Sequence, residues 1–524
     1  MPAQRTTTPS PMSMPITPAP LRAPPKLLSK SRLISWRQCE KRLWLEARQP
    51  ELQDLSASTE AAFAIGNEVG GIARTLYDPA GKGWLVEIES GNVSGAIART
   101  TELLRDRKPI FEAGFATDRA RAFADILLPV TRGGKPAWRM VEVKSSSSVK
   151  EYYLDDVAIQ ARIARAAGVP LAQISLAHVD TTWTYPGNDD YQGLLVEHDL
   201  TQKAFARGDE VDGWVEAAHR IVRQRTPPKI TTGAHCNAPY PCGFIEHCTA
   251  QEPQAEYPVA WLPRVQTKAL KAHIEDGGIT DLRQVDDALL NERQLRVKRH
   301  TLSGEAYFDK AGAAAALAEH RLPAWFLDFE TIQFPVPIWK GTRPYQNIPF
   351  QFSVHRLGRN GRLAHVPFLD LSCGDPSRPL AEALIAACGE RGPVFVYNAV
   401  FEKSRIRELA ARFPALRRGL LAIEARIVDL QPIAEAHYYH PSQQGSWSLK
   451  AVLPAIASDV SYDTLDGVQD GGAAMEAYRE AIAPETSRAR KAEIERQLLA
   501  YCERDTIALV HLWQRFTGRQ PASR

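Results

Sequence analysis

The chain has 524 residues, of which 44% are hydrophobic, so it can bury more than one core, and its length predicts two to four domains. It contains no run of eighteen apolar residues and begins without the compact apolar segment of a secretory signal, so we expect no membrane-spanning helix and a cytoplasmic location. The formal charge of +3 is too small to identify a polyanionic partner. Any assignment to nucleic acid must therefore come from motifs.

Residues 1–28 are rich in Pro, Thr and Ser and predict a disordered tail; the prolines would break the amphipathic helix of a transit peptide. From Ser31 the segment SRLISWRQCEKRLWLE predicts one amphipathic helix. Apolar strands are expected at 123–130 and 138–144 around a Gly-Gly turn, followed by a helix at 151–167. This part is therefore a β-hairpin that leads into a helix.

The second half begins with a mainly helical stretch, residues 255–318, in which a Gly-Gly pair separates two short helical segments. Such a segment is either a helix-hairpin-helix, which often grips a DNA backbone, or a plain interdomain linker. A new α/β unit starts at Trp325. Its strand-like segments are WFLDFET, FQFSVHRL, HVPFLDL, VFVYNAV and ARIVDL.

Four carboxylates of this unit form a candidate metal site. In a strand Asp328 and Glu330 point to the same face, and such neighbours repel unless a cation lies between them. An isolated D-x-E is usually a solvent-facing pair, but Glu402 follows the next strand, and Tyr501 and Asp505 lie one helical turn apart farther on. Two divalent ions held by four carboxylates could activate a water for in-line attack at phosphorus, with Tyr501 orienting or helping to deprotonate that water.

The order D-x-E, N-x-x-F-E and Y-x-x-x-D resembles the DEDDy branch of the DnaQ-like exonucleases over residues 322–520. This resemblance implies an RNase H-like fold, two Mg²⁺ or Mn²⁺ ions on Asp328, Glu330, Glu402 and Asp505, and 3′ to 5′ hydrolysis. Glu402 stands where the family usually has Asp, which lengthens the arm by one methylene. Asp429 and the run 446–450 resemble family segments that position substrate, or are simply a strand end and a helix cap.

A second candidate site lies in the predicted hairpin. Asp125 is in the first strand, and Glu142 and Lys144 share a face of the second. Two carboxylates can bind a metal, and the ammonium can hold the attacking water or stabilise charge at phosphorus. A lone E-x-K is commonly a surface pair, and the upstream Asp125 favours the metal site.

Seven cysteines in a chain expected in the cytosol favour metal binding or buried thiols over disulfides. The order Cys39, Asp125, Glu142-x-Lys144, Gln160 and then three cysteines resembles the RecB-like PD-(D/E)xK nucleases with an iron–sulfur cluster, including the AddB type and the CRISPR-associated adaptation nucleases. The resemblance implies catalytic roles for Asp125, Glu142, Lys144 and Gln160, with Asp125 and Glu142 as metal ligands. It also implies a 4Fe–4S cluster, or a structural zinc, bound by Cys39, Cys236, Cys242 and Cys248.

This half departs from the family pattern in three places. Gly70 replaces the metal-binding His, Ala164 replaces an aromatic, and five residues rather than two separate Cys236 from Cys242. Glu68 could substitute for the His, or this half could be a nucleic-acid-binding remnant. The neighbouring His235 and His247 could replace a cysteine ligand, although four cysteines suffice. The remaining cysteines are interpreted as ordinary packed thiols: Cys373, Cys388 and Cys502.

The expected architecture is α/β throughout and resembles a bacterial family that fuses a RecB-like, restriction-endonuclease-type domain to a DnaQ-like domain. We expect a metal-dependent DNA nuclease that acts on single strands or ends in repair, recombination or defence. The alternatives are a ribonuclease using the same DEDDy site and a nucleic-acid-binding protein with degenerate sites. The predicted parts are the tail (1–28), the RecB-like domain (29–252), the helical linker (253–320) and the DnaQ-like domain (321–520).

Overall fold

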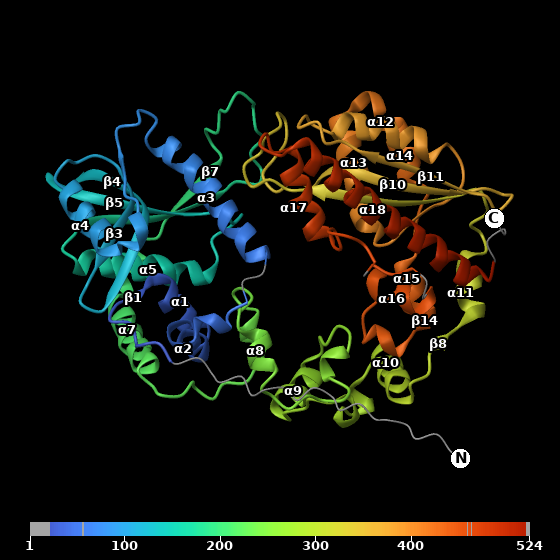
Figure 1. The fold of residues 1–524 in the computed structure, drawn as a ribbon, viewed down its shortest axis with the longest axis horizontal. Coiled ribbons are helices and arrows are strands. Elements are labelled where there is room, and N and C mark those ends of the chain that lie inside the picture. Colours follow the sequence, from blue (N-terminus) through green and yellow to red (C-terminus); the bar gives the residue numbers. More distant parts are fainter. Residues whose placement is uncertain (1–20, 55–56, 458–459, 463, 520–524) are drawn as a thin grey trace, which may run out of the picture. The chain divides into compact units, whose positions relative to one another are not determined.

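The computed structural model describes residues 21–54, 57–457, 460–462 and 464–519, so most of the expected tail lies outside the described residues. The chain forms two compact α/β units (Figure 1). The N-terminal unit is Met1–Val179 with Leu195–Glu252, and the C-terminal unit is Asp180–Leu194 with Pro253–Arg524. No helix in the described part of the chain is both long and apolar enough to cross a membrane.

The N-terminal unit is built on a mixed sheet with the order β2-β3-β4-β5-β6-β7, and β1 pairs with β4. The predicted hairpin is present, because β4 and β5 pair antiparallel around Gly133 and Gly134, both with positive φ. After helix α5 the chain returns as β6, parallel to β5. The strands are β1 Leu28–Ser29, β2 Trp84–Leu85, β3 Ile110–Ala116, β4 Ala120–Arg132, β5 Lys135–Lys144, β6 Leu171–Val179 and β7 Leu195–Asp199.

The prediction of a single helix from Ser31 is wrong. Two helices, α1 and α2, meet at Cys39, whose extended backbone (φ −162°, ψ 124°) interrupts the helical hydrogen bonding and sets its thiol at the junction. The helices of this unit are α1 Lys30–Gln38, α2 Glu40–Arg48, α3 Ala57–Tyr77, α4 Val93–Leu103, α5 Glu151–Ala166, α6 Thr201–Ala206, α7 Gly208–Val222 and α8 Ile245–Thr249, with short 3-10 turns η1 Pro50–Leu52, η2 Glu89–Gly91 and η3 Ala234–Cys236.

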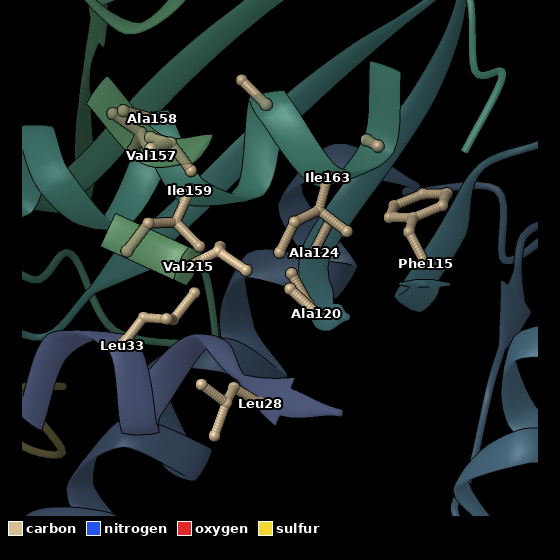
Figure 2. Packing of buried hydrophobic residues seen from close by; sticks show 14 of the residues in the cluster. Leu28, Leu33, Phe115, Ala120, Ala124, Val157, Ala158, Ile159, Ile163 and Val215 are labelled. Carbon is tan, nitrogen blue, oxygen red and sulfur yellow. The ribbon is translucent and has the colours of Figure 1, made fainter. Parts of the chain in front are cut away.

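One face of this sheet carries the main core of the N-terminal unit. Figure 2 shows Ile163 of α5 over Ala120 and Ala124 of β4, while Ile159 points toward Val215 of α7 and Leu33 of α1. Each of the Ile, Leu and Val side chains contributes about 1.5–3 kcal/mol when fully buried. Helix α3 covers the other face, where its Ala73 packs in a smaller cluster with Val141 of β5.

The C-terminal unit contains a five-stranded sheet with the order β11-β10-β9-β12-β13, and each strand overlaps one of the five predicted segments. The segment VFVYNAV is a strand only at its start, because its last residues begin α13. Strand β10 is antiparallel to β9 and β11, whereas β12 and β13 run parallel to β9. A small sheet pairs β14 with β8. The strands are β8 Tyr307–Phe308, β9 Ala324–Ile332, β10 Ile348–Leu357, β11 Leu363–Leu369, β12 Val394–Val396, β13 Ile427–Asp429 and β14 Tyr438–Tyr439.

The alternation of β9 sorts its side chains between the two faces of this sheet. Trp325, Leu327 and Phe329 pack in a core with α12, α13 and α14, so Asp328 and Glu330 point to the opposite face of the sheet. Helix α18 packs against β9 and β10 on that opposite face (Figure 1). The helices that follow β9 in the chain are α12 Ser377–Cys388, α13 Ala399–Arg412, α14 Arg417–Glu424, α15 Gln431–His437, α16 Leu449–Ile456, α17 Gly471–Ile482 and α18 Arg488–Thr517, with 3-10 turns η7 Pro414–Leu416 and η8 Pro441–Gln443.

The segment that was expected to be a helical linker is mainly helical. The Gly277–Gly278 pair ends α9, but the next element is a 3-10 turn, so within residues 268–290 the two α-helices of a helix-hairpin-helix are not formed. The elements here are η4 Val259–Trp261, α9 Lys268–Asp276, η5 Leu282–Gln284, η6 Asp287–Leu289, α10 Glu292–Ser303 and α11 Lys310–Leu317.

Candidate metal centres

We define the C-terminal carboxylate cluster as Asp328, Glu330, Glu402 and Asp505. Strand β9 provides the first two of these residues. Asp328 lies opposite Ser353 and Glu330 opposite Gln351 in the β9–β10 ladder, so both carboxylates share the face toward α18. Glu330 is buried. The structure therefore brings the D-x-E pair together beneath a long helix, where water has little access.

Helix α18 supplies the third motif. Ligand atoms of Asp328, Glu330 and Cys502 lie within 4.8 Å of one another. Asp505 lies on the same helix, and its Oδ1 accepts a hydrogen bond of 2.5 Å from the Tyr462 hydroxyl. Tyr501 is buried beside these groups. The helix thus delivers the predicted Tyr501 and Asp505 to the β9 pair.

Glu402 enters from the first turn of α13, directly after β12. The turn is held by Asp429, which accepts hydrogen bonds from the backbone N–H groups of Asn398 (3.1 Å) and Ala399 (2.9 Å). Glu402 is only 3% exposed, and its Oε2 has no hydrogen-bond partner among the described residues. A buried carboxylate oxygen without a partner is costly unless a proton or a cation satisfies it.

The electrostatics of this cluster favour the neutral acids. Burial, followed by the charges of Asp505, Glu330 and Glu402, raises the pKa of Asp328 well above its usual range, and burial with Asp505 does the same to the pKa of Glu330. Burial raises the pKa of Glu402 to about 8. Burial also raises the pKa of Asp505 to about 6, against the lowering effects of Tyr462, Lys450 and Tyr501. In the absence of an added cation, Asp328, Glu330 and Glu402 therefore favour their protonated forms near neutral pH, whereas Asp505 is mostly ionised.

Three further side chains belong to this site. The ammonium of Lys450 lies 5.5 Å from the ring centroids of both Tyr462 and Tyr501. Lys450 falls in the run expected to position substrate, whereas Tyr462 lies in a loop and carries no motif. Cys502, interpreted as an ordinary packed thiol, is buried, but its Sγ is 3.8 Å from Asp328 Oδ2. Burial and the carboxylates raise the pKa of Cys502 well above its usual value, so it remains a thiol.

Asp429 and Ser448, which belong to the segments that resemble substrate-positioning segments of the family, have structural roles. Asp429 ends β13, and besides capping α13 it accepts a hydrogen bond from the N–H of Gln431 at 3.0 Å. Ser448 is the N-cap of α16 and accepts from the N–H of Ala451 at 3.3 Å. For both, the reading as a strand end and a helix cap accounts for the contacts.

The N-terminal acidic cluster, which we define as Asp125, Glu142 and Asp156, lies where β4, β5 and α5 meet. The Val143 N–H donates to Asp125 Oδ2 (2.7 Å), which ties β4 to β5. Lys144 Nζ donates to Glu142 Oε1 (2.7 Å), and Gln160 Nε2 donates to Glu142 Oε2 (2.5 Å). All four predicted residues of this site are therefore in one place.

Sequence reasoning missed Lys30 and Asp156 in this cluster. Lys30, at the start of α1, places Nζ 2.8 Å from Glu142 Oε1 and 3.0 Å from Asp156 Oδ1. Lys144 Nζ lies 2.5 Å from Asp156 Oδ2. Burial opposes ionisation of Asp156, but Lys144 and Lys30 outweigh it and hold the pKa of that carboxyl below its usual range. Two ammonium groups therefore neutralise much of this cluster from within.

Two other features mark the N-terminal acidic cluster. Burial, followed by the charge of Glu142, raises the pKa of Asp125 to about 8. Glu112 lies on β3 and has a positive φ of 55°. The β3–β4 pairing is interrupted here, because neither Glu112 nor the facing Asp125 is paired across the two strands. Burial and Glu142 also raise the pKa of Glu112. The register is the same on both sides of this interruption, so it is not a bulge; a non-glycine residue with positive φ inside a strand is a strained conformation of the kind found at functional sites, and nothing in the sequence predicts it.

The four predicted cysteine ligands line one cavity of about 330 Å³, its open mouth included. Cys39 comes from the α1–α2 junction, and Cys236, Cys242 and Cys248 come from the loop before and within α8. Gln38 Nε2 fastens that loop, donating to the carbonyl oxygens of His235 and Tyr240 at 2.8 Å each. None of these cysteines forms a disulfide.

The cysteine sulfurs are spread more widely than a zinc site requires. With Zn–S bonds of about 2.3 Å, tetrahedral geometry places sulfurs about 3.8 Å apart. Among the described residues, no three of these sulfurs lie within 4.8 Å of one another. His235 also lines the cavity, and its Nε2 is 3.6 Å from Cys236 Sγ.

The comparisons with known proteins concern the C-terminal unit. A family model described as a domain of unknown function (DUF2779) matches residues 325–448, from β9 to the N-cap of α16. The match includes Asp328, Glu330 and Glu402 and ends before Tyr501 and Asp505. No curated protein matches the chain. Because the family's description names no activity, any functional assignment rests on the geometry of the sites.

Proposed function

We propose that this chain is a metal-dependent nuclease whose C-terminal unit hydrolyses phosphodiester bonds at a two-metal site. The observation that carries the proposal is a group of four carboxylates from β9, α13 and α18: ligand atoms of Asp328 and Glu330 lie within 4.8 Å of one another, and burial and the charges of Asp505 and Glu402 raise the pKa of Asp328. Their pKa values are raised by burial and, at Asp328 and Glu330, also by mutual repulsion, and Glu402 Oε2 has no protein partner among the described residues. Such a set is stabilised by divalent cations with oxygen ligands, namely Mg²⁺ or Mn²⁺.

The strand arrangement supports the finer assignment. A central β9, flanked by an antiparallel β10–β11 meander on one side and parallel β12 and β13 on the other, is the arrangement expected of an RNase H-like, DnaQ-type domain. The D-x-E motif lies on β9, N-x-x-F-E lies at the start of α13 and Y-x-x-x-D lies on α18, and this distribution supports the DEDDy resemblance. We therefore propose 3′ to 5′ exonucleolytic cleavage.

Carboxylates, phenol and ammonium would each do a different part of the chemical work. Two divalent ions bound to the four carboxylates would supply an activated water and stabilise the leaving 3′-oxygen. Burial and the surrounding carboxylates raise the pKa of Tyr501, so its phenol stays protonated and orients the water by hydrogen bonding. Lys450, held over the rings of Tyr501 and Tyr462, adds positive charge where the phosphate backbone would lie.

For the N-terminal unit we propose a RecB-like PD-(D/E)xK domain. Asp125 and Glu142 would hold a divalent ion, Lys144 would stabilise charge at phosphorus, and Gln160 supports Glu142. The buried Gln160 Oε1 has no hydrogen-bond partner among the described atoms, which leaves one acceptor free toward a cation. Lys30 competes with that cation for Glu142 Oε1. We propose that this site binds metal more weakly than the C-terminal cluster and that the unit contributes mainly nucleic-acid binding.

For the cysteines we propose a 4Fe–4S cluster bound by Cys39, Cys236, Cys242 and Cys248. Four thiolates suit either a cluster or zinc, but the wide sulfur spacing favours the larger group. Its role would be structural, because Cys39 and Cys248 come from opposite ends of the N-terminal unit. Visible absorbance of freshly purified protein distinguishes the two, since a zinc site is colourless.

Single-stranded DNA, or DNA ends, is the proposed substrate, in repair, recombination or defence. The test is digestion of end-labelled single-stranded DNA, duplex DNA and RNA with Mg²⁺ or Mn²⁺, comparing wild type with Asp328→Ala, Lys144→Ala and the exposed control Glu382→Ala. We expect loss of DNA cleavage in Asp328→Ala alone. Preferential RNA cleavage would assign the same site to a ribonuclease, and cleavage unaffected by Asp328→Ala would overturn the proposal.

A further inference from the structure

A second cluster of metal-ligand side chains lies on the α18 face of the C-terminal sheet. His355 of β10 and His365 of β11 are direct cross-strand partners, and their rings stack with centroids 4.5 Å apart. Glu503 of α18 lies across from them, with Oε1 3.6 Å from His365 Nδ1. One ligand atom from each of the three residues lies within 4.8 Å of the other two.

Hydroxyl groups fix which nitrogen of each ring carries the proton. His355 Nδ1 is 2.8 Å from Thr506 Oγ1, which is 2.6 Å from Ser353 Oγ, which in turn is 2.9 Å from His365 Nε2. Thr506 Oγ1 is also 3.2 Å from the Glu503 carbonyl oxygen, which can only accept. All four contacts are hydrogen bonds only if Thr506 donates to that carbonyl, Ser353 donates to Thr506, His355 Nδ1–H donates to Thr506, and His365 Nε2–H donates to Ser353.

This arrangement leaves both imidazoles with an unprotonated nitrogen, His355 Nε2 and His365 Nδ1. The lone pair of His365 Nδ1 is the one near the Glu503 carboxylate, so two acceptors oppose each other with no proton between them. A cation placed between these two acceptors would bond to both of them.

We propose that His355, His365 and Glu503 bind a divalent transition-metal ion of the Zn²⁺ class. Two neutral imidazole nitrogens and one carboxylate oxygen form a donor set that suits zinc better than Mg²⁺, which prefers oxygen. The hydroxyls of Thr506 and Ser353 bond the remaining ring nitrogens, as the outer partners of metal-bound histidines do. The Glu503 side chain is 52% exposed, which gives the ion a path from solvent.

The ion would act as a clamp between the sheet and the helix. It would join the β10–β11 pair to α18, the helix that carries Tyr501 and Asp505. Its ligands are separate from the carboxylate cluster, since Ser353, not His355, lies opposite Asp328 in the ladder. Binding of this ion does not require the C-terminal carboxylates to be a nuclease site.

The experiment counts tight Zn²⁺ equivalents in chelator-stripped full-length protein by competition with a chromophoric chelator. Wild type is compared with Glu503→Gln, His365→Gln, His355→Gln and the half-buried control His300→Gln, which lies outside this site. We expect the three ligand variants to bind one equivalent less than wild type and the control. Because Glu503 is half exposed, Glu503→Gln tests the site even if the buried His355→Gln fails to fold.

Cobalt separates this site from the cysteines. In wild type loaded with Co²⁺ we expect d–d absorption that Glu503→Gln diminishes, while any thiolate-to-cobalt charge-transfer bands from the cysteines stay unchanged. An Asp328→Asn variant should still bind this Zn²⁺ equivalent, because the Asp328 carboxylate does not belong to the donor set of His355, His365 and Glu503. Equal Zn²⁺ stoichiometry in wild type, Glu503→Gln and His365→Gln would overturn the proposal.

Discussion

The two acidic clusters of this chain use similar residues and differ in where their positive charge comes from. In the N-terminal acidic cluster, Lys30 and Lys144 both lie within 3.0 Å of carboxylate oxygens. In the C-terminal carboxylate cluster, Lys450 contacts the rings of Tyr462 and Tyr501 and leaves Asp328, Glu330 and Glu402 without an ion pair among the described residues. The first cluster is neutralised internally, whereas the second needs protons or added cations.

This difference shows that a sequence motif alone does not determine how strongly a group of carboxylates binds a metal ion. An acidic pair with two ammonium groups at hydrogen-bond distance has little left to offer an ion, even when the Asp, Glu, Lys and Gln of the family pattern are all present. Buried carboxylates without such partners have raised pKa values, and a divalent ion can replace their protons. Substitutions that remove one carboxylate or one ammonium at a time can break or sharpen this contrast.

The largest effect is expected at Glu402. Glu402→Gln removes a ligand charge and should lower DNA cleavage by more than about 100-fold, since even outer-shell partners of metal ligands contribute 10–100-fold. Glu402→Asp, which keeps the charge, should retain most activity. Initial rates on single-stranded DNA with Mn²⁺ provide the measurement, and equal rates for Glu402→Gln and wild type would remove Glu402 from the site.

The metal-free protein should lose stability as the pH rises. Burial raises the pKa of Glu402 from 4.5 to about 8 and that of Asp505 from 3.8 to about 6. At a pH between the lower and the higher pKa of either residue, the folded chain therefore binds more protons than the unfolded chain. The free energy of unfolding therefore falls with pH across this window. At pH 8.5, Glu402→Gln should stabilise the metal-free C-terminal unit by about 2–4 kcal/mol, with little effect at pH 4.5.

Calorimetry of the full chain tests this pH dependence. Mn²⁺ should raise the Tm of wild type more at pH 8.5 than at pH 6, because binding must displace protons at the lower pH. A metal-free wild type that becomes more stable between pH 6 and 8.5 would contradict the assignment of uncompensated carboxylates.

Removal of Lys30 should make the metal affinity of the N-terminal site more similar to that of the C-terminal site. Lys30→Met frees Glu142 Oε1 from one of its two ammonium partners and should tighten Mn²⁺ binding there by about tenfold, or about 1.4 kcal/mol. Calorimetric titration in an Asp328→Asn background isolates this site, and Lys26→Met, an exposed lysine ahead of β1, is the control. Unchanged affinity would show that Lys30 does not compete with metal.

The smallest effect is expected at Gly70, which occupies the position of the family's histidine. A Cβ built there meets no atom within 4 Å, so Gly70→His should fit and add a ligand, with a gain of a few-fold in Mn²⁺ affinity. Gly66→His, one turn earlier on α3 and equally open, is the matched control. The same change in both variants would indicate a general effect on the helix and not a ligand.

Local sequence pattern predicted the elements and residues whose placement depends on neighbours along the chain. Strand alternation placed Asp328 with Glu330 and Glu142 with Lys144, and helical spacing placed Tyr501 with Asp505. Lys30 was missed because its partner Glu142 is 112 residues away, and no local pattern encodes that contact. The pairing of His355 with His365 likewise depends on the register between two strands, which the sequence leaves open.

The most direct test of the central claim is anomalous diffraction from crystals of the full-length protein soaked in Mn²⁺ at pH 8. We predict two strong manganese peaks among Asp328, Glu330, Glu402 and Asp505, with a weaker peak or none at Asp125 and Glu142. The absence of manganese from the C-terminal carboxylates, or a stronger peak beside Lys30 and Lys144, would contradict the assignment of the metal site to the C-terminal unit.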